Sequence, residues 1–436
     1  MADLRCSFAG IKSPNPFWLA SAPPTDKAYN VHRAFEAGWG GVVWKTLGED
    51  GPPIVNVNGP RYGALLTPDR RMLGFNNIEL ITDRPLQTNL DEIREVKRAW
   101  PERALVVSLM VPCTEAAWKA ILARVEGTGA DGVELNFGCP HGMSERGMGA
   151  AVGQVPEYIE QVTAWCKQHS RLPVIVKLTP NVTDIRPAAA AARRGGADAV
   201  SLINTINSII GVDPLTLTIS PATGGMGSHG GYCGPAVKPI ALHMVAEIGR
   251  AAATAGLPIS GIGGIASWRD ALDYIALGAG NVQVCTAAMA YGFKIVQDMA
   301  SGLSEYMDER GFATIEDFRG RALPSITDWQ YLNLNAISKA EIAQDLCIRC
   351  GRCHIACEDT SHQAITATKD GARHFEVKDE DCVGCNLCVT VCPVPECITL
   401  RQLAPGELDA RTGLAVLAQA ADWTRHPNNP LRRQPA

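Results

Sequence analysis

Val174-Ile175-Val176-Lys177-Leu178 is a short run of aliphatic residues interrupted by a single lysine. Runs of this kind are typical of parallel strands that are buried on both faces. Similar runs recur between residues 17 and 286, separated by longer Ala-rich amphipathic stretches, and this alternation predicts repeated βα units around a parallel sheet. The eight expected strands are Phe17–Ser21, Gly41–Thr46, Ala104–Met110, Gly132–Phe137, Val174–Leu178, Ala199–Asn204, Pro258–Gly263 and Asn281–Thr286.

The ends of these strands carry polar residues and glycines. In chain order they are Ser21, Lys45, Thr46, Asn136, Lys177, Asn204, Thr205, Gly263, Gly264, Cys285 and Thr286. The active site of a (β/α)8 TIM barrel lies at the C-terminal ends of its strands, so the pattern predicts a catalytic barrel. Strands also end in polar residues simply because loops face water. The recurrence of two lysines and two asparagines at equivalent offsets favours a site.

The overall composition excludes several classes of partner. The chain has 436 residues, of which 46% are hydrophobic and 19% charged, and its net charge is -5. This balance provides no cationic field for nucleic acid or anionic lipid, so neither partner is expected. No run of about 18 apolar residues and no signal peptide is visible. We therefore expect a cytoplasmic protein that does not enter a membrane.

The cysteines are concentrated near the C-terminus. Nine of the 15 fall between Cys347 and Cys397, which in a reducing compartment indicates metal ligation rather than disulfides. Two copies of the spacing C-x2-C-x2-C-x3-C are present, and this doubled motif is typical of a ferredoxin-like domain with two 4Fe-4S clusters. The copies are Cys347, Cys350, Cys353 and Cys357, followed by Cys382, Cys385, Cys388 and Cys392.

In such a motif three cysteines bind one cluster and the fourth completes the other. The expected ligand sets are Cys347, Cys350, Cys353 with Cys392, and Cys382, Cys385, Cys388 with Cys357. Structural zinc is the alternative, but it would need one set of four ligands and gives no reason for two matched copies. Glu358 stands where proline usually follows the fourth cysteine. Cys397 lies outside both motifs and is expected to be a buried thiol.

These patterns divide the chain into four parts. We expect a catalytic barrel over residues 1–320, a connecting segment over 321–335, a domain with two 4Fe-4S clusters over 336–403 and a poorly ordered tail over 404–436. Three long Gly- and Pro-rich loops should lie at the barrel rim, at about 48–84, 140–155 and 207–232. Within the second, residues 141–149 are expected to form a mobile lid.

The barrel should also bind a flavin. Clusters carry single electrons, and flavin is the usual converter to a two-electron substrate. Gly263-Gly264 and Cys285-Thr286, after the seventh and eighth strands, offer bare backbone amides where barrels commonly bind a cofactor phosphate, although a Gly-Gly pair also suits a plain tight turn. No G-x-G-x-x-G follows a strand, so no dinucleotide-binding fold is expected.

One stretch is specific enough to suggest a family. Asn136-Phe-Gly-Cys-Pro-His-Gly-Met-Ser-Glu-Arg-Gly-Met-Gly resembles the dihydropyrimidine dehydrogenases and, more loosely, the flavin barrels of the dihydroorotate dehydrogenases. Asn76-Asn77-Ile-Glu-Leu-Ile, Lys177-Leu-Thr-Pro-Asn, Asn204-Thr205 and Val284-Cys-Thr also match, and the likeness covers about residues 1 to 400. It is similar to the bacterial subunit that carries FMN and two iron-sulfur clusters, whose partner subunit carries FAD and binds NAD(H).

The resemblance implies a role for each matching residue. Asn77, Asn136, Asn204 and Thr205 would bind the pyrimidine, because an amide can both donate to and accept from the alternating groups of uracil. Glu79 would support these asparagines, and Lys177 would stabilise the charge of the reduced flavin. The residues expected to hold FMN are Ser21, Lys45, Thr46, Lys177, Gly234, Gly263, Gly264, Cys285 and Thr286.

The same resemblance makes Cys139 the general acid. Hydride from FMN N5 would add to C6 of uracil or thymine, and Cys139 would protonate C5 to give the reversible 5,6-dihydro product. His141 would tune this thiol or only shape the loop. By residue type alone a cysteine is more often a buried small hydrophobe. The family usually has serine before this cysteine, whereas this chain has Gly138.

The resemblance further implies a hetero-oligomer with a homodimeric core, in which electrons from NAD(H) reach the clusters through the FAD-containing partner. Two other functions remain open. One is dihydroorotate oxidation, which needs a cation for the substrate carboxylate, and Lys45 is a candidate. The other is a non-catalytic electron-transfer subunit whose barrel only docks a partner.

Overall fold

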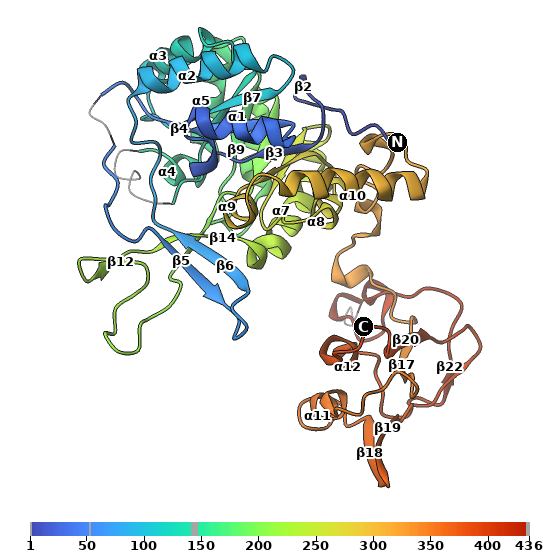
Figure 1. Cartoon of the computed structure of the whole chain (residues 1–436). Helices are drawn as coiled ribbons and strands as arrows, with labels where there is room; N and C mark the ends of the chain where they lie inside the picture. The colour runs from blue at the N-terminus through green and yellow to red at the C-terminus, as the bar shows by residue number, and fades with distance from the viewer. Residues whose placement is uncertain (1, 52–53, 141–146, 433–436) are drawn as a thin grey trace. The chain divides into compact units, whose positions relative to one another are not determined.

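The computed structural model describes residues 2–51, 54–140 and 147–432. It divides into two compact units, Met1–Pro324 and Ser325–Ala436. Figure 1 follows the chain from one unit into the next, and each unit is described by itself.

The first unit is a closed barrel of eight parallel strands, as expected from the sequence. The strand order around the barrel is β10-β15-β16-β3-β4-β7-β8-β9, and every neighbouring pair is parallel. All eight predicted strands are present. They are β3 (Phe17–Leu19), β4 (Gly41–Leu47), β7 (Ala104–Leu109), β8 (Gly132–Asn136), β9 (Val174–Lys177), β10 (Ala199–Leu202), β15 (Ile259–Ile262) and β16 (Ala279–Val284).

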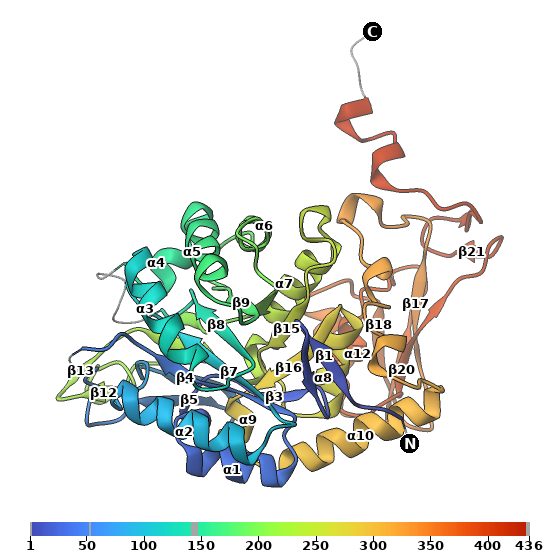
Figure 2. The same ribbon diagram turned by 90° about the horizontal axis from the view of Figure 1, so that it is seen from above.

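Helices surround the barrel strands (Figure 2). Their ends follow local sequence signals: Ser267 and Asp270 form a capping box at the start of α8, and Gly38 ends α1 at a φ of 118°. The helices are α1 (Ala28–Ala37), α2 (Leu86–Ala99), α3 (Glu115–Glu126), α4 (Ala150–Gly153), α5 (Pro156–His169), α6 (Arg186–Arg194), α7 (Lys238–Arg250), α8 (Trp268–Ala276), α9 (Thr286–Tyr291) and α10 (Ile295–Arg310).

The barrel interior changes from apolar to polar along the strands. Its amino-terminal end is filled by an apolar cluster that includes Trp18, Val43, Val106, Ile175 and Ala199. The hairpin of β1 (Cys6–Phe8) and β2 (Ile11–Ser13) contributes Phe8 and Ile11 to this cluster.

Side chains alternate along a strand, so the residue two positions further on faces the same side. Lys45 and Lys177 therefore follow Val43 and Ile175 toward the carboxyl ends of the strands. The two charged side chains, Lys45 and Lys177, therefore lie inside the barrel near its carboxyl-terminal rim.

A four-stranded antiparallel sheet lies beside the barrel mouth, largely in segments for which the sequence predicts long loops. Its order is β11-β14-β6-β5, and a two-stranded pair, β12-β13, accompanies it (Figure 1). The pairing joins distant segments, since Asn77 is opposite Gly231. The strands are β5 (Tyr62–Leu66), β6 (Met72–Asn77), β11 (Ile206–Ser208), β12 (Ala222–Thr223), β13 (Met226–Gly227) and β14 (Gly230–Cys233).

In its described residues, the second unit contains short pairs of antiparallel strands and two short α-helices. A core cluster joins both halves of the doubled cysteine motif with Ala340, Ile365, Phe375 and Ile398. The elements are β17 (Ser338–Ile342), α11 (Arg352–Glu358), β18 (Ile365–Asp370), β19 (Ala372–Val377), α12 (Leu387–Val391) and β20 (Ile398–Gln402). Strand β17 pairs with β20, and β18 pairs with β19.

A buried ion pair ties the tail segment to this core. In the segment from residue 404, for which the composition predicts poor order, β21 (Leu408–Asp409) pairs with β22 (Leu414–Ala415). Lys339 Nζ lies 2.7 Å from Asp409 Oδ1, and the two side chains are 2% and 4% exposed. Lys339 also donates to the backbone oxygens of Asp379 and Cys382 at 2.7 and 2.8 Å.

Within the described part of the chain, no helix is both long enough and apolar enough to span a bilayer.

Replacing Lys339 by Ala should destabilise the second unit, because Asp409 and two backbone oxygens lose their cationic partner. Breaking a buried ion pair from one side costs about 3 kcal/mol or more. We expect amide hydrogen exchange in β17 and β20 of the full chain to become about 100-fold faster.

Lys378→Ala is the matched control. Lys378 pairs with Asp381 at 3.5 Å, and its side chain is 43% exposed. Surface pairs contribute less than about 1 kcal/mol, so exchange in this variant should stay close to that of the parent chain. Equal exchange rates in the two variants would contradict the role of Lys339.

Candidate active site

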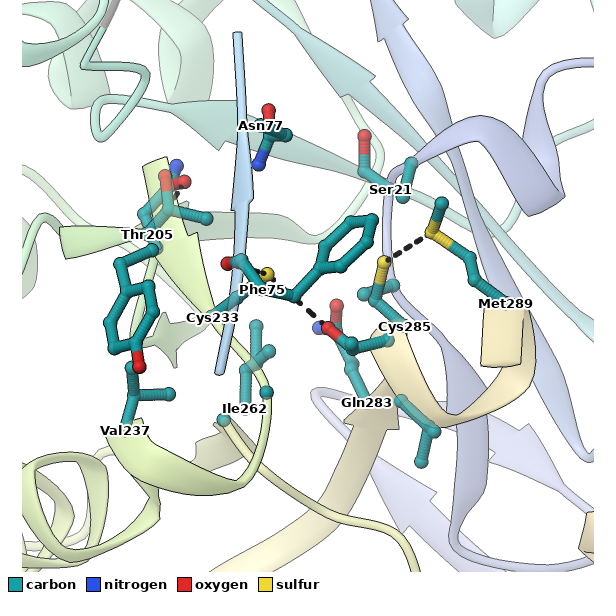
Figure 3. Close-up of a pocket in the computed structure, with 18 of the residues that line it drawn as sticks. Ser21, Phe75, Asn77, Thr205, Cys233, Val237, Ile262, Gln283, Cys285 and Met289 are labelled. Atoms are coloured by element: carbon teal, nitrogen blue, oxygen red, sulfur yellow. Dashed lines mark hydrogen bonds between the residues drawn. The ribbon is translucent and has the colours of Figure 1, made fainter. Parts of the chain in front are cut away.

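A cavity at the carboxyl ends of the barrel strands brings the predicted barrel residues together. It contains about 1360 Å³ of empty space, its open mouth included. Figure 3 shows part of its lining, with Ser21, Asn77, Thr205 and Cys285 around it. Every predicted barrel-site residue lines this cavity: Ser21, Lys45, Thr46, Asn77, Asn136, Cys139, Lys177, Asn204, Thr205, Gly234, Gly263, Gly264, Cys285 and Thr286.

Both lysines of the cavity have carboxylate partners. Lys45 Nζ lies 2.6 Å from Glu79 Oε1 and 3.6 Å from Asp26 Oδ2. Lys177 Nζ lies 3.3 Å from Glu134 Oε1, and Glu134 is fully buried inside the barrel. Because an unpaired charge is costly away from water, each pair balances a lysine that the strand pattern places in the interior.

Glu134 has further contacts that hold it beneath Lys177. Its Oε2 accepts hydrogen bonds from Ser201 Oγ at 2.8 Å and from Gln283 Nε2 at 3.2 Å. Gln283 also lines the cavity, and its Oε1 has no hydrogen-bond partner among the described residues. The barrel interior therefore contains, beside the cavity, a buried polar atom without a hydrogen-bond partner among the described residues.

A chain of hydroxyl and amide groups crosses the cavity. Ser21 and Thr46 share a hydrogen bond of 3.1 Å, and Asn136 Nδ2 donates to Thr46 Oγ1 at 3.0 Å. Asn136 Oδ1 accepts from Asn204 Nδ2 at 2.9 Å, while Asn204 Oδ1 accepts from the Thr205 amide at 2.8 Å. The amide planes of the two asparagines are thus fixed before a ligand arrives.

Asn77 reaches the same cavity from the antiparallel sheet rather than from the barrel. It ends β6, and its Nδ2 donates to the backbone oxygen of Gly231 on β14 at 3.2 Å. The close packing of the sheet thereby orients an amide toward the barrel rim.

Gly138 explains how Asn204 can lie so close to the segment that carries Cys139. A Cβ atom at Gly138 would lie 2.5 Å from Asn204 Cβ and 2.6 Å from Asn204 Nδ2. Real Cβ atoms do not approach backbone-anchored neighbours this closely. The glycine therefore permits the observed position of Asn204, and a serine here would require this asparagine to shift.

The glycines after β14 and β15 form part of the cavity wall. Gly234, Gly263 and Gly264 have φ angles of 87°, 135° and 67°, which L-side chains rarely adopt. Tyr274 Oη donates to the Gly263 backbone oxygen at 2.6 Å and holds the turn. Backbone that carries no side chain can approach a phosphate closely.

The thiols of Cys233 and Cys285 also line the cavity (Figure 3). Thr286 Oγ1 donates to Cys233 Sγ at 3.3 Å. Burial raises the pKa of Cys233 to about 11 and that of Cys285 to about 12. Both are therefore protonated near neutral pH.

Cys139 also lines the cavity and packs beside an apolar cluster of Ile81, Met110 and Met148. Its backbone oxygen accepts from the Ala150 amide at 3.2 Å. His141 and most of the expected lid lie outside the described residues.

Sequence reasoning missed Tyr62, Phe75 and Glu134. Tyr62 and Phe75 stack with their ring centroids 5.2 Å apart, and both line the cavity from the antiparallel sheet. Glu134 could have been found, because it lies two residues before Asn136 on the same face of β8.

The cysteines of the second unit surround two cavities. One is lined by Cys347, Cys350, Cys353 and Cys392, with Cys397 also in its wall. The other is lined by Cys357, Cys382, Cys385 and Cys388. These groups are the two sets expected from the spacing, each with one cysteine from the opposite copy. Among the described residues, no three His, Cys, Asp or Glu side chains converge tightly enough to hold a single ion.

Comparisons with known proteins agree with the predicted fold class of both parts of the chain. The dihydroorotate dehydrogenase family model matches residues 4–307, and the 4Fe-4S dicluster domain model matches residues 340–400. These matches define an oxidoreductase barrel followed by a domain for two iron-sulfur clusters.

Similarity to individual curated proteins assigns the chain more specifically within this family. The chain is 41% identical over 401 residues to the NAD-dependent dihydropyrimidine dehydrogenase subunit PreA of Escherichia coli K12, covering 92% of this chain and 96% of that protein. It is 41% identical over 333 residues to the chloroplastic dihydropyrimidine dehydrogenase (NADP(+)) of Arabidopsis thaliana, covering 74% and 78%. The catalytic subunit of dihydroorotate dehydrogenase B (NAD(+)) from Pyrococcus abyssi is 36% identical over 321 residues, covering 73% and 99%.

The chain therefore belongs to the dihydropyrimidine dehydrogenases of the dihydroorotate dehydrogenase family, as its motifs predicted. Its cofactors are FMN and two 4Fe-4S clusters. The barrel residues fit FMN, because the cavity combines bare backbone at Gly263 and Gly264 with the unsatisfied Gln283 Oε1. The two cysteine-lined cavities fit the clusters.

Gly264→Ala should weaken FMN binding. The new Cβ would lie 2.9 Å from the Gly234 backbone oxygen and 2.8 Å from Lys238 Cβ, at a positive φ. We expect at least about tenfold weaker binding, measured as the FMN content of purified protein and by titration of flavin-depleted protein.

Gly256→Ala is the control, because Gly256 has a φ of 78° but open space around its Cβ position. It imposes a similar backbone strain away from the cavity. Loss of FMN from both variants to the same extent would show that strain alone, and not the cavity wall, is responsible.

Proposed function

We propose that the chain is the catalytic subunit of a dihydropyrimidine dehydrogenase, which converts uracil or thymine reversibly to the 5,6-dihydro form. The observation that carries this proposal is the combination of an amide-lined cavity with lysines that are already paired. Asn77, Asn136, Asn204 and Thr205 offer donors and acceptors to a neutral ring. Lys45 and Lys177 lie within 2.6 and 3.3 Å of carboxylates.

The asparagines bind and orient the pyrimidine. Because Asn136 and Asn204 already hydrogen-bond to each other, their remaining N–H groups and lone pairs point in fixed directions. Fixed donors lose little entropy on binding, so a planar ring is held in one orientation. FMN, when bound in the cavity, would supply or accept a hydride at C6 of this ring.

Cys139 is the acid and base at C5. A positioned thiol can give a proton to this carbon during reduction and remove it during oxidation. Cys139 lines the cavity and directly follows Gly138, whose lack of a side chain lets the backbone pack closely against Asn204. Lys177, held by Glu134, is the cation that stabilises negative charge on the reduced cofactor.

The two clusters connect this site to an electron donor. We propose that the donor is an FAD-containing partner subunit that binds NAD(H), in a hetero-oligomer with a homodimeric core. The name of the Escherichia coli relative, a subunit of an NAD-dependent enzyme, supports an assembly of more than one kind of chain. The proposed compartment is the cytoplasm, where thiolate ligands stay reduced.

Cys139→Ala should reduce turnover without removing the flavin. The side chain donates the C5 proton but lies outside the proposed phosphate site. A positioned general acid contributes about 100-fold or more, so we expect at least this loss in uracil reduction with FMN content unchanged. Cys166→Ala is a suitable control, because Cys166 is fully buried in α5. Unchanged turnover in Cys139→Ala would remove this residue from the mechanism.

Dihydroorotate oxidation is the second candidate function, because a relative named dihydroorotate dehydrogenase B is 36% identical. Anaerobic mixing of the holoprotein with dihydrouracil or dihydroorotate separates the two. We expect dihydrouracil to bleach the flavin faster, and the opposite preference would replace the proposed substrate. Protein purified with clusters but without FMN would instead support an electron-transfer subunit.

Cys357 and Cys397 test the proposed cluster ligands. Cys357 lies in the cavity of Cys382, Cys385 and Cys388, so Cys357→Ala should remove one cluster. Cys397 lines the other cavity outside the motif, so Cys397→Ala should keep both. Iron content and the electron paramagnetic resonance spectrum of the reduced protein measure the result. Cluster loss in Cys397→Ala with retention in Cys357→Ala would reverse the assignment.

A further inference from the structure

A charged cluster at the cavity wall centres on Glu79, which follows β6. Glu79 Oε1 lies 2.6 Å from Lys45 Nζ and 3.6 Å from Arg61 Nη1. Its other oxygen, Oε2, accepts a hydrogen bond from Tyr62. Two cations and a phenol therefore hold a single carboxylate, whose side chain is 9% exposed.

Glu79 is the principal anion in this cluster. Asp26 is the other carboxylate near Lys45, but it lies further away, at 3.6 Å. Burial raises the pKa of Asp26, which favours its neutral form relative to an exposed aspartate. Lys45 is thus neutralised mainly by the carboxylate in contact with it.

Glu79 is also held in place. Tyr62 stacks on Phe75 at 5.2 Å with an interplanar angle of 24°, so the phenol that donates to Glu79 is itself packed. A carboxylate fixed by three neighbours cannot turn away to make room for a second one. A ligand carboxylate at Lys45 would have to displace Glu79 or lie beside it.

We propose that Glu79 is a specificity-determining residue that excludes pyrimidines bearing a carboxylate, by occupying Lys45 and Arg61 with its own negative charge. This inference rests on the proposed function, because it states which pyrimidines that site rejects. Like charges brought together at a binding site oppose association strongly, whereas a neutral ring meets no such repulsion. Lys45, the cation that could bind the carboxylate of a dihydroorotate-type substrate, is present but is already paired with Glu79.

Glu79→Gln tests the proposal, because glutamine keeps the shape and an acceptor oxygen but removes the charge. Oxidised, FMN-loaded protein is titrated with uracil and with orotate, a uracil that carries a carboxylate, and the change in flavin absorbance gives each Kd. We expect the ratio of the orotate Kd to the uracil Kd to fall by at least about tenfold in Glu79→Gln. An unchanged ratio would overturn the role of Glu79.

Glu92→Gln is the matched control. Glu92 pairs with Arg84 and does not line the cavity, so its neutralisation should leave the ratio as in the parent protein. A ratio that falls equally in both variants would mean that the effect is one of overall charge, which would also overturn the proposal.

A second measurement needs no variant. The parent protein is titrated with orotamide, in which a neutral amide replaces the carboxylate at nearly the same size. We expect orotamide to bind at least about tenfold more tightly than orotate. Equal rejection of both would show that size rather than charge excludes them. Failure of the proposed function is distinguishable, because the parent protein would then prefer orotate to uracil from the start.

Discussion

Closure of the parallel barrel is the constraint from which the site follows. Strands β9 and β10, and β16 and β3, complete the ring, so all eight carboxyl ends meet at one rim. Because side chains alternate along a strand, Lys45 and Lys177 point into the barrel and line the cavity, while an apolar cluster fills the amino-terminal end of the barrel. Away from bulk water each lysine requires a counter-charge, and Glu79 and Glu134 supply it. The neutrality of the cavity is thus a consequence of how the barrel is built.

The site has a second source in the antiparallel sheet at the mouth. The barrel supplies Asn136, Asn204 and the glycine turns, whereas the sheet supplies Asn77 and the aromatic pair that supports Glu79. The wall of the cavity is therefore assembled from two separate sheets, one parallel and one antiparallel.

The sequence predicted the barrel and the ring of polar residues because both arise from short-range patterns. A buried strand such as Val174–Lys177 and the residue at its end are visible locally. The mouth sheet contains local pairs, β5 with β6 and β11 with β14, but the β6–β14 pairing that unites them joins distant segments, as between Asn77 and Gly231, and no short-range pattern predicts it. The resemblance implies that Glu79 supports the asparagines, whereas the structure brings it into contact with Lys45, 34 residues away on β4. The contact of Gly138 with Asn204 likewise depends on two separate strands meeting at the rim.

The second unit shows a different kind of dependence between its parts. Helix α11 contains Cys353, which faces one cavity, and Cys357, which faces the other. Cys388 in α12 and Cys392 at its end reverse this relation. A helix of less than two turns cannot become ordered at one end only. Each short helix therefore carries expected ligands of both clusters, so that its position relates the shape of one cavity to that of the other.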